Sequence, residues 1–135
     1  MNLPRSVREY CKGVLKEHKT TQKMYEELKE DIIHAKNRSI SGMPVHYNNE
    51  SMTESKAIQL INDRQLMFLE KRMVAVEETL KEIPPISLSI LMLLYLDNTH
   101  KVEGAMMKLN IGSKKTFYRY HDEGLRCLAR RLMVY

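Results

Sequence analysis

The spacing of small and apolar side chains near the start of the chain constrains its fold more than any other feature. These side chains recur at alternating steps of four and three residues from position 7 to position 35, at Val7, Cys11, Val14, His18, Thr21, Tyr25, Leu28, Ile32 and Ala35. Such spacing puts them on one side of an α-helix and is typical of a coiled-coil seam. Pro4 can open this helix, because an N–H group in the first turn has no partner inside a helix. The pattern predicts one helix of about 34 residues and ~50 Å.

Two interpretations of this long stripe remain open. His18 and Thr21 weaken its middle, and an intramolecular helical hairpin would bury part of it inside one chain. A helix of ~50 Å nevertheless outreaches a compact neighbouring module and would leave apolar positions in water. We therefore expect a homodimer whose seam contains Val7, Cys11, Val14, Tyr25, Leu28 and Ile32.

A polar segment separates this helix from a second one. Residues 37–51 contain Gly42 and Pro44 among Ser and Asn, which predicts a turn of about fifteen residues. Val45, His46 and Tyr47 could pack against the helices. Ser51 or Thr53 supplies the capping signal of a second long helix that extends to about Ile83, before Pro84 and Pro85. Its expected stripe is Ala57, Leu60, Ile61, Met67, Phe68, Val74, Ala75 and Leu80.

The composition favours an all-α protein. The chain has 135 residues, 43% of them hydrophobic, with only 5 Gly and 4 Pro and no run of alternating β-branched residues. We expect two long helices joined by a long loop over residues 1–83, forming the hairpin or oligomerisation region, and a compact helical module over residues 84–135. The nearly all-round apolar segment 86–96 would be the buried first helix of that module.

Positive charge concentrates in the C-terminal module. The net charge is +5; residues 1–85 hold 14 Lys and Arg against 13 Asp and Glu, whereas residues 86–135 hold 8 against 4. All eight of those cations lie from Lys101 onward. Such a localised excess is the electrostatic pattern of a nucleic-acid-binding surface.

The segment 101–132 has the pattern of a helix-turn-helix. A short apolar-periodic stretch stops at Asn110, Ile111 and Gly112, where Asn and Gly tolerate the left-handed backbone of a tight turn. Ser113 is a favoured N-cap for the next helix. One stripe of that helix is expected to be buried, at Phe117, His121, Leu125, Leu128 and Leu132.

The other side of that helix carries the candidate DNA-reading residues. Residues near the N-terminus of the second helix of a helix-turn-helix meet base edges in the major groove. We therefore expect Lys114, Lys115, Tyr118 and Arg119 to face the groove, with Ser113 and Thr116 near the DNA backbone. Phosphate contacts would come from Lys101, Lys108, Arg126 and Arg130.

The run from Ser113 through Thr116 to Arg119, with Gly124 and Leu125 further on, resembles the ArpU and RinA type of phage transcriptional regulators. Those families in turn are similar to region 4 of bacterial sigma factors, where a polar turn, here residues 97–100, precedes the positioning helix. The chain departs from the pattern by an extra Gly112 and by Gly124 in place of the usual Ala. The resemblance covers residues 84–133 and implies a double-stranded DNA-binding regulator of phage or prophage origin that activates late genes.

Two other functions remain open. Small terminase subunits also combine a DNA-binding helix-turn-helix with long oligomerising helices, but form rings. A sigma-like adaptor would bind host RNA polymerase or a sigma factor instead of DNA, and would show no salt-dependent binding to a duplex.

Catalysis, metal binding and membrane insertion are not expected. The five His are scattered and match no metal or catalytic motif, and no Gly-rich phosphate loop or nucleophile motif occurs. Cys11 and Cys127 are far apart and are expected to be reduced thiols, which suits the cytoplasm. The longest apolar run, 90–96, is far shorter than the ~20 residues of a membrane span. No cofactor is implied.

Overall fold

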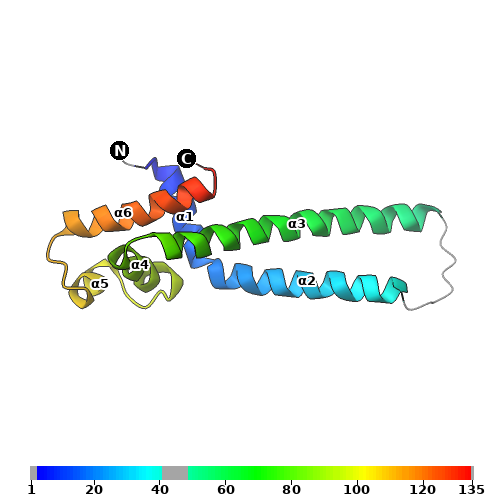
Figure 1. The fold of residues 1–135 in the computed structure, drawn as a ribbon, viewed down its shortest axis with the longest axis horizontal. Coiled ribbons are helices and arrows are strands. Elements are labelled where there is room, and N and C mark those ends of the chain that lie inside the picture. Colours follow the sequence, from blue (N-terminus) through cyan, green and yellow to red (C-terminus); the bar gives the residue numbers. More distant parts are fainter. Residues whose placement is uncertain (1–2, 41–48, 135) are drawn as a thin grey trace. The chain divides into compact units, whose positions relative to one another are not determined.

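The protein is all-α, as the sequence predicts. The computed structural model describes the backbone of residues 3–40 and 49–134, and the side chains of residues 3–34 and 58–134. Within those residues the chain forms six α-helices and one π-helical turn, without a strand (Figure 1). The helices are α1 (Arg5–Lys16), α2 (His18–Ile40), α3 (Asn49–Glu82), α4 (Pro85–Leu91), the π-helical η1 (Met92–Leu96), α5 (Val102–Lys108) and α6 (Lys114–Arg131).

The connection between the two long helices is shorter than predicted. Helix α2 continues to Ile40 and α3 already begins at Asn49, so part of the expected loop is helical. The suggested packing of Val45, His46 and Tyr47 lies outside the described residues.

The single long helix predicted from residue 4 to residue 35 is wrong. The chain leaves helical geometry at Glu17, which has φ −90° and ψ 0° and separates α1 from α2. The N–H of Glu17 still bonds to the carbonyl of Gly13 at 3.0 Å, so the last turn of α1 is complete before the break. The break falls just before His18, where the apolar repeat is weakest.

The chain divides into two compact units that differ from the predicted domains. Unit 1 contains residues 1–19 and 72–135, and unit 2 contains residues 20–71. The expected boundary after residue 83 therefore does not coincide with the observed one. Helix α3 contributes to both units, because its C-terminal part carries Val76 and Ile83 into the core of unit 1.

Unit 1 has a well-packed apolar core to which its first helix contributes fully. Helix α1 packs against α6 and η1, and α4 packs against α6 and η1. Cys11, Val14 and Leu15 of α1 are buried in the same cluster as side chains from the other helices, including Val76, Ile90, Leu91, Phe117, Leu125 and Leu128. Val7 is half-buried against this cluster. Val7, Cys11 and Val14 of the predicted dimer seam thus pack against other helices of the same chain, so the prediction that they pair with a second copy is wrong.

Unit 2 consists of the remaining part of α2 and the N-terminal part of α3. The stripe predicted on α2 lies on the inner side, since Thr21 and Ile32 are buried and Tyr25 and Leu28 are half-buried within a single chain. On α3, Leu69 is buried, and Asn62 and Leu66 are half-buried. Of the two interpretations left open by the sequence, unit 2 follows the intramolecular hairpin.

The stripe predicted on α3 is wrong for most of its residues. Five of its eight members are exposed: Leu60, Ile61, Met67, Phe68 and Val74. The buried stripe instead runs through Leu69, Val76, Thr79 and Ile83, whose spacing of seven, three and four is equally helical. Helix α3 has apolar side chains on more than one side, and periodicity alone does not tell which side a neighbouring helix covers.

Candidate nucleic-acid interface

Helices α5 and α6 are joined by a tight turn that begins with Asn110. Asn110 has φ 57°, in the left-handed region where Asn is one of the few tolerated non-Gly residues. Its N–H bonds to the carbonyl of Met107 at 3.3 Å, and the N–H of Ile111 bonds to that of Met106 at 2.9 Å. This pair of bonds is a Schellman motif, in which the last free carbonyls of α5 are satisfied. Asn110, and not Gly112, adopts the left-handed backbone, so the expectation for Gly112 is wrong.

The start of α6 follows the sequence-based prediction. Ser113 has an extended backbone, with φ −115° and ψ 125°, and its hydroxyl accepts a hydrogen bond from the N–H of Thr116 at 3.4 Å. The remaining free N–H groups of the first turn, together with the helix dipole, give this end of α6 a partial positive charge.

The buried side of α6 also agrees with the prediction. Phe117, His121, Leu125 and Leu128 are buried, and Leu132 is half-buried. Between them, Gly124 lies against α4 so closely that a Cβ atom there would be 2.8 Å from Cδ1 of Leu91. The close approach leaves no room for a Cβ atom at this position unless Leu91 shifts.

A chain of hydrogen bonds fixes α6 to η1 and α1. The Tyr95 hydroxyl lies 2.6 Å from Nε2 of His121, and Nδ1 of His121 lies 2.9 Å from Oδ1 of Asp122. Because a carboxylate only accepts, Nδ1 carries the proton and Nε2 accepts from Tyr95. The other carboxylate oxygen of Asp122 accepts a bond from Arg8 at 3.4 Å.

Burial is the main influence on the titration of this hydrogen-bonded chain. It lowers the pKa of His121, although the hydrogen bond to Asp122 acts in the opposite direction. It raises the pKa of Tyr95 well above its usual range. His121 is therefore neutral and Tyr95 is a hydrogen-bond donor at neutral pH.

The widened helical turn η1 precedes helices α5 and α6 in the chain. The N–H of Asp97 bonds to the carbonyl of Met92 at 2.8 Å, five residues back, and those of Thr99 and His100 both bond to Leu93. Asn98, with φ 52°, reverses the chain after this turn. The π-helical turn thus ends the segment that presents Tyr95 to His121, and the non-helical residues 97–101 connect it to α5.

The four proposed base-reading residues are all exposed but do not form one row. Lys115 and Arg119, four residues apart, lie on the side of α6 opposite its buried stripe, and Lys114 and Tyr118 lie about 100° away around the helix. Tyr118 keeps 41% of its surface exposed while its ring meets Phe117 and His121 edge-on. The guanidinium carbon of Arg119 lies 5.0 Å from the ring centre of Tyr120, a cation–π contact that restrains it.

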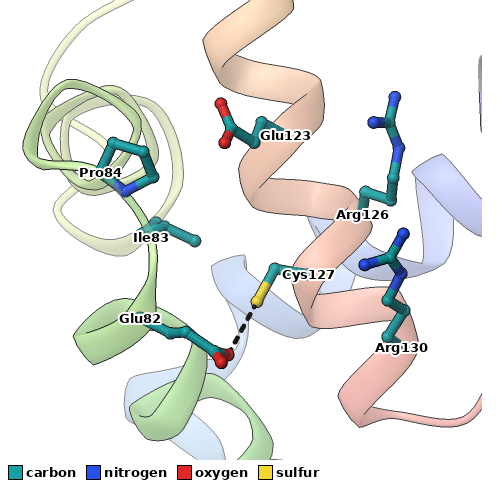
Figure 2. Close-up of a pocket in the computed structure, with 7 residues that line it drawn as sticks. All are labelled: Glu82, Ile83, Pro84, Glu123, Arg126, Cys127 and Arg130. Carbon is teal, nitrogen blue, oxygen red and sulfur yellow. Dashed lines mark hydrogen bonds between the residues drawn. The ribbon is translucent and has the colours of Figure 1, made fainter.

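The other predicted contact residues divide into two groups. Ser113, Lys101 and Lys108 are exposed around the turn and α5, and Thr116 is half-buried beside them. Arg126, half-buried, and Arg130, exposed, instead line a small pocket between the C-terminal half of α6 and the end of α3 (Figure 2). The structure therefore separates these two arginines from the cations near the turn.

Acidic side chains accompany the arginines of that pocket. Glu82 and Glu123 line it together with Ile83, Pro84 and Cys127, and the Cys127 thiol bonds to Glu82 at 3.3 Å (Figure 2). Arg131 also bonds to Glu82, at 2.7 Å, and this bond holds the pKa of the Glu82 carboxyl below its usual value. The mixed charge makes this end of α6 less suited to phosphate than its N-terminal end.

The sequence did not identify several residues that position α6. Tyr120 supports Arg119, and its carbonyl accepts a bond from the Ser87 hydroxyl at 2.9 Å. Arg8 and Asp122 connect α1 to α6 across more than a hundred residues. The pair of a buried His121 and the next residue, Asp122, could have indicated such a network. The spacing of residues along the chain does not predict that Tyr95 bonds to His121 and Arg8 to Asp122.

Two further observations concern metal binding and the membrane. No group of three His, Cys, Asp or Glu side chains in them is arranged to hold a metal ion. No helix in the same part of the chain is long and apolar enough to cross a membrane.

The comparisons with known proteins add no relative. No protein-family model, no curated protein and no solved structure matches this chain. The candidate interface therefore depends on its own geometry and charge.

Proposed function

We propose that this protein is a sequence-specific DNA-binding transcriptional regulator that reads the major groove with the N-terminal half of α6. One observation carries the proposal: all five Lys and Arg side chains between residues 101 and 119 are exposed, and that segment holds a single acidic residue, Glu103. They lie around a tight helix-to-helix turn and the positive end of an 18-residue helix. Charge, helix dipole and free N–H groups all favour phosphate there.

The rigidity of α6 supports the same proposal. A reading helix must hold its side chains in fixed register, and α6 is fixed by the Ser113 cap, by the close approach at Gly124 and by the His121 hydrogen bonds. Arg119 is further restrained on the Tyr120 ring. A positioned Arg can bond two acceptors of one guanine, which makes it the best candidate for a base contact.

Two copies would be needed to read a site of useful length. One reading helix contacts only a few base pairs, so regulators of this kind bind two half-sites as dimers. We therefore include a homodimer in the proposal, together with the phage or prophage origin and late-gene activation that the resemblance implies.

Binding to duplex DNA tests the proposal. A fluorescently labelled mixed-sequence duplex of about 30 base pairs should bind with an affinity that falls steeply with salt, because bound cations displace counterions. Selection from a random duplex pool should then yield a preferred sequence.

Variants at the interface sharpen this test. Arg119→Ala should weaken binding to the selected duplex by about 1 to 3 kcal/mol and the mixed duplex much less. Lys101→Ala should weaken both alike. Lys23→Ala removes an exposed cation from unit 2 and serves as the matched control. Salt-independent or absent binding to every duplex would contradict DNA binding and favour a protein partner such as RNA polymerase.

A further inference from the structure

Helix α3 carries a second apolar surface that its own chain leaves in solvent. Leu60, Ile61 and Met67 are 54%, 56% and 66% exposed, although the same helix buries another stripe in the hairpin. Single exposed apolar residues are common on proteins, but these three lie within eight positions of one helix, with Leu60 and Met67 in the same row nearly two turns apart. We call the side of α3 that carries Leu60, Ile61 and Met67 its outer surface.

The residues of the outer surface repeat at intervals of seven. Leu60 is followed by Met67 and Ile61 by Phe68; in the same way Asp63 is followed by Glu70 and Arg64 by Lys71. Seven residues make nearly two helical turns, so each pair forms a row along the helix. Such a repeat is the sequence pattern of helices that pack lengthwise on another helix.

Charged rows lie on both sides of the row formed by Leu60 and Met67. At 100° per residue, the acidic row of Asp63 and Glu70 lies roughly 60° to one side and the basic row of Arg64 and Lys71 roughly 40° to the other. All four charged side chains are exposed, and none forms an ion pair with another residue in the described part of the chain.

We propose that the outer surface of α3 pairs with the outer surface of α3 in a second copy of this chain, parallel and in register. A two-fold axis along the helices sets the acidic row of each copy opposite the basic row of the other. An antiparallel pair would set acidic row against acidic row and basic against basic, because that symmetry keeps each row on its own side. Opposite charges beside an apolar seam select the parallel arrangement.

This pairing names the surface through which the proposed homodimer forms and does not depend on DNA binding. It uses a different surface from the seam predicted over residues 7–35, of which the chain itself buries Cys11, Val14, His18, Thr21 and Ile32. A parallel arrangement also brings residue 72 of both copies, where each α3 enters unit 1, to the same end of the pair.

Mass in solution tests the surface. Sedimentation of the full chain at tens of micromolar should give twice the 15.9 kDa of one chain, and Leu60→Glu with Met67→Glu should reduce it to that of one chain. Circular dichroism should stay unchanged, because both side chains are exposed. Met107→Glu, at an 80% exposed Met on α5, is the matched control and should keep the double mass. A monomeric unmodified protein, or an undiminished mass in the double variant, overturns the proposal.

Disulfide formation tests the orientation. In a Cys127→Ser background the remaining thiol, Cys11, is fully buried. A parallel pair sets both residue 60 and residue 67 beside their own copies, so Leu60→Cys and Met67→Cys should each give a cross-linked dimer under mild oxidation. In an antiparallel pair only one residue can lie on the two-fold axis, and these two are ~10 Å apart along the helix, whereas a disulfide needs Cα atoms within ~7 Å.

A control position on α3 distinguishes specific cross-linking from random cross-linking. Gln65→Cys, on the opposite side of α3, is the control and should stay monomeric on a reducing-agent-free gel. Cross-linking at only one of the two positions overturns the parallel orientation, and cross-linking at neither, or equally at Gln65→Cys, overturns the surface. The proposed DNA contact fails separately, through Arg119→Ala, so the two failures cannot be confused.

Discussion

Cys11 and Val14 of α1 and Tyr25 and Leu28 of α2 belong to the same repeat and are three residues apart in each pair, yet the structure buries the two pairs to different degrees. Cys11 and Val14 are completely covered in the core of unit 1, whereas Tyr25 and Leu28 of unit 2 are half-buried. The difference comes from the number of neighbours. Unit 1 surrounds α1 with α6 and η1, while unit 2 has only parts of two helices. Periodicity identifies an apolar side, and the surrounding elements decide how far it is covered.

The largest expected effect on stability comes from truncating one leucine in each unit to alanine. Leu15→Ala should lower the free energy of unfolding by about 2 to 5 kcal/mol, because Leu15 is fully buried and the change leaves a cavity. Leu28→Ala should cost roughly half as much, since water already reaches that side chain. Urea denaturation followed by circular dichroism measures both. Equal losses would mean that unit 2 is as tightly packed as unit 1.

A second prediction compares two glycines within unit 1. Gly124→Ala should destabilise the protein by about 1 to 2 kcal/mol, because its Cβ would meet Leu91, which is itself fully buried and cannot move without cost. Gly13→Ala on α1 meets nothing within 4 Å and should stabilise by about 0.5 to 1 kcal/mol through helix propensity alone. Melting temperatures should shift in opposite directions. A stabilising Gly124→Ala would show that α4 and α6 pack less closely than described.

A third prediction concerns the pH dependence of the unit 1 core. Burial lowers the pKa of His121 and of His18, so the folded protein resists a proton that the unfolded chain accepts below pH 6.5. The free energy of unfolding should therefore be constant above that pH and fall as the pH drops below it. His121→Gln can keep both hydrogen bonds and should flatten the decline, leaving the contribution of His18. An unchanged slope would exclude His121 as its source.

The smallest expected effect is that of the ion pair between α1 and α6. Arg8 and Asp122 lie 3.4 Å apart with side chains 30% and 17% exposed, so their coupling in a double-mutant cycle should be about 0.5 to 1 kcal/mol. The cycle uses Arg8→Ala, Asp122→Ala and the double variant, which cancels the separate bond of Asp122 to His121. A coupling as large as the loss in Leu15→Ala would mean that charge, and not apolar burial, holds α1 in unit 1.

Much of the α5 to α6 region could be predicted from the sequence because local rules decide it. The Ser113 cap, the turn at Asn110 and the buried side of α6 depend on residues within a few positions of one another. Exposure of Lys115 and Arg119 follows from the same periodicity.

The rest depended on contacts between distant segments. The helical break at Glu17 follows α1, which packs on the distant helix α6. The buried stripe of α3 depends on which of its apolar sides packs against a neighbouring helix. The partners of His121 come from η1 and α1, far away in sequence. None of these is fixed by the spacing of residues along one helix.

The place of α1 in unit 1 has a consequence for synthesis of the protein. Its packing partner α6 is translated roughly 100 residues later, so α1 must wait, with Cys11, Val14 and Leu15 uncovered, until most of the chain has left the ribosome. The hairpin of unit 2 can form in the meantime from neighbouring segments. Folding of α6 is therefore coupled to the fate of the nascent N-terminus, and a chaperone that holds α1 would delay formation of the core of unit 1.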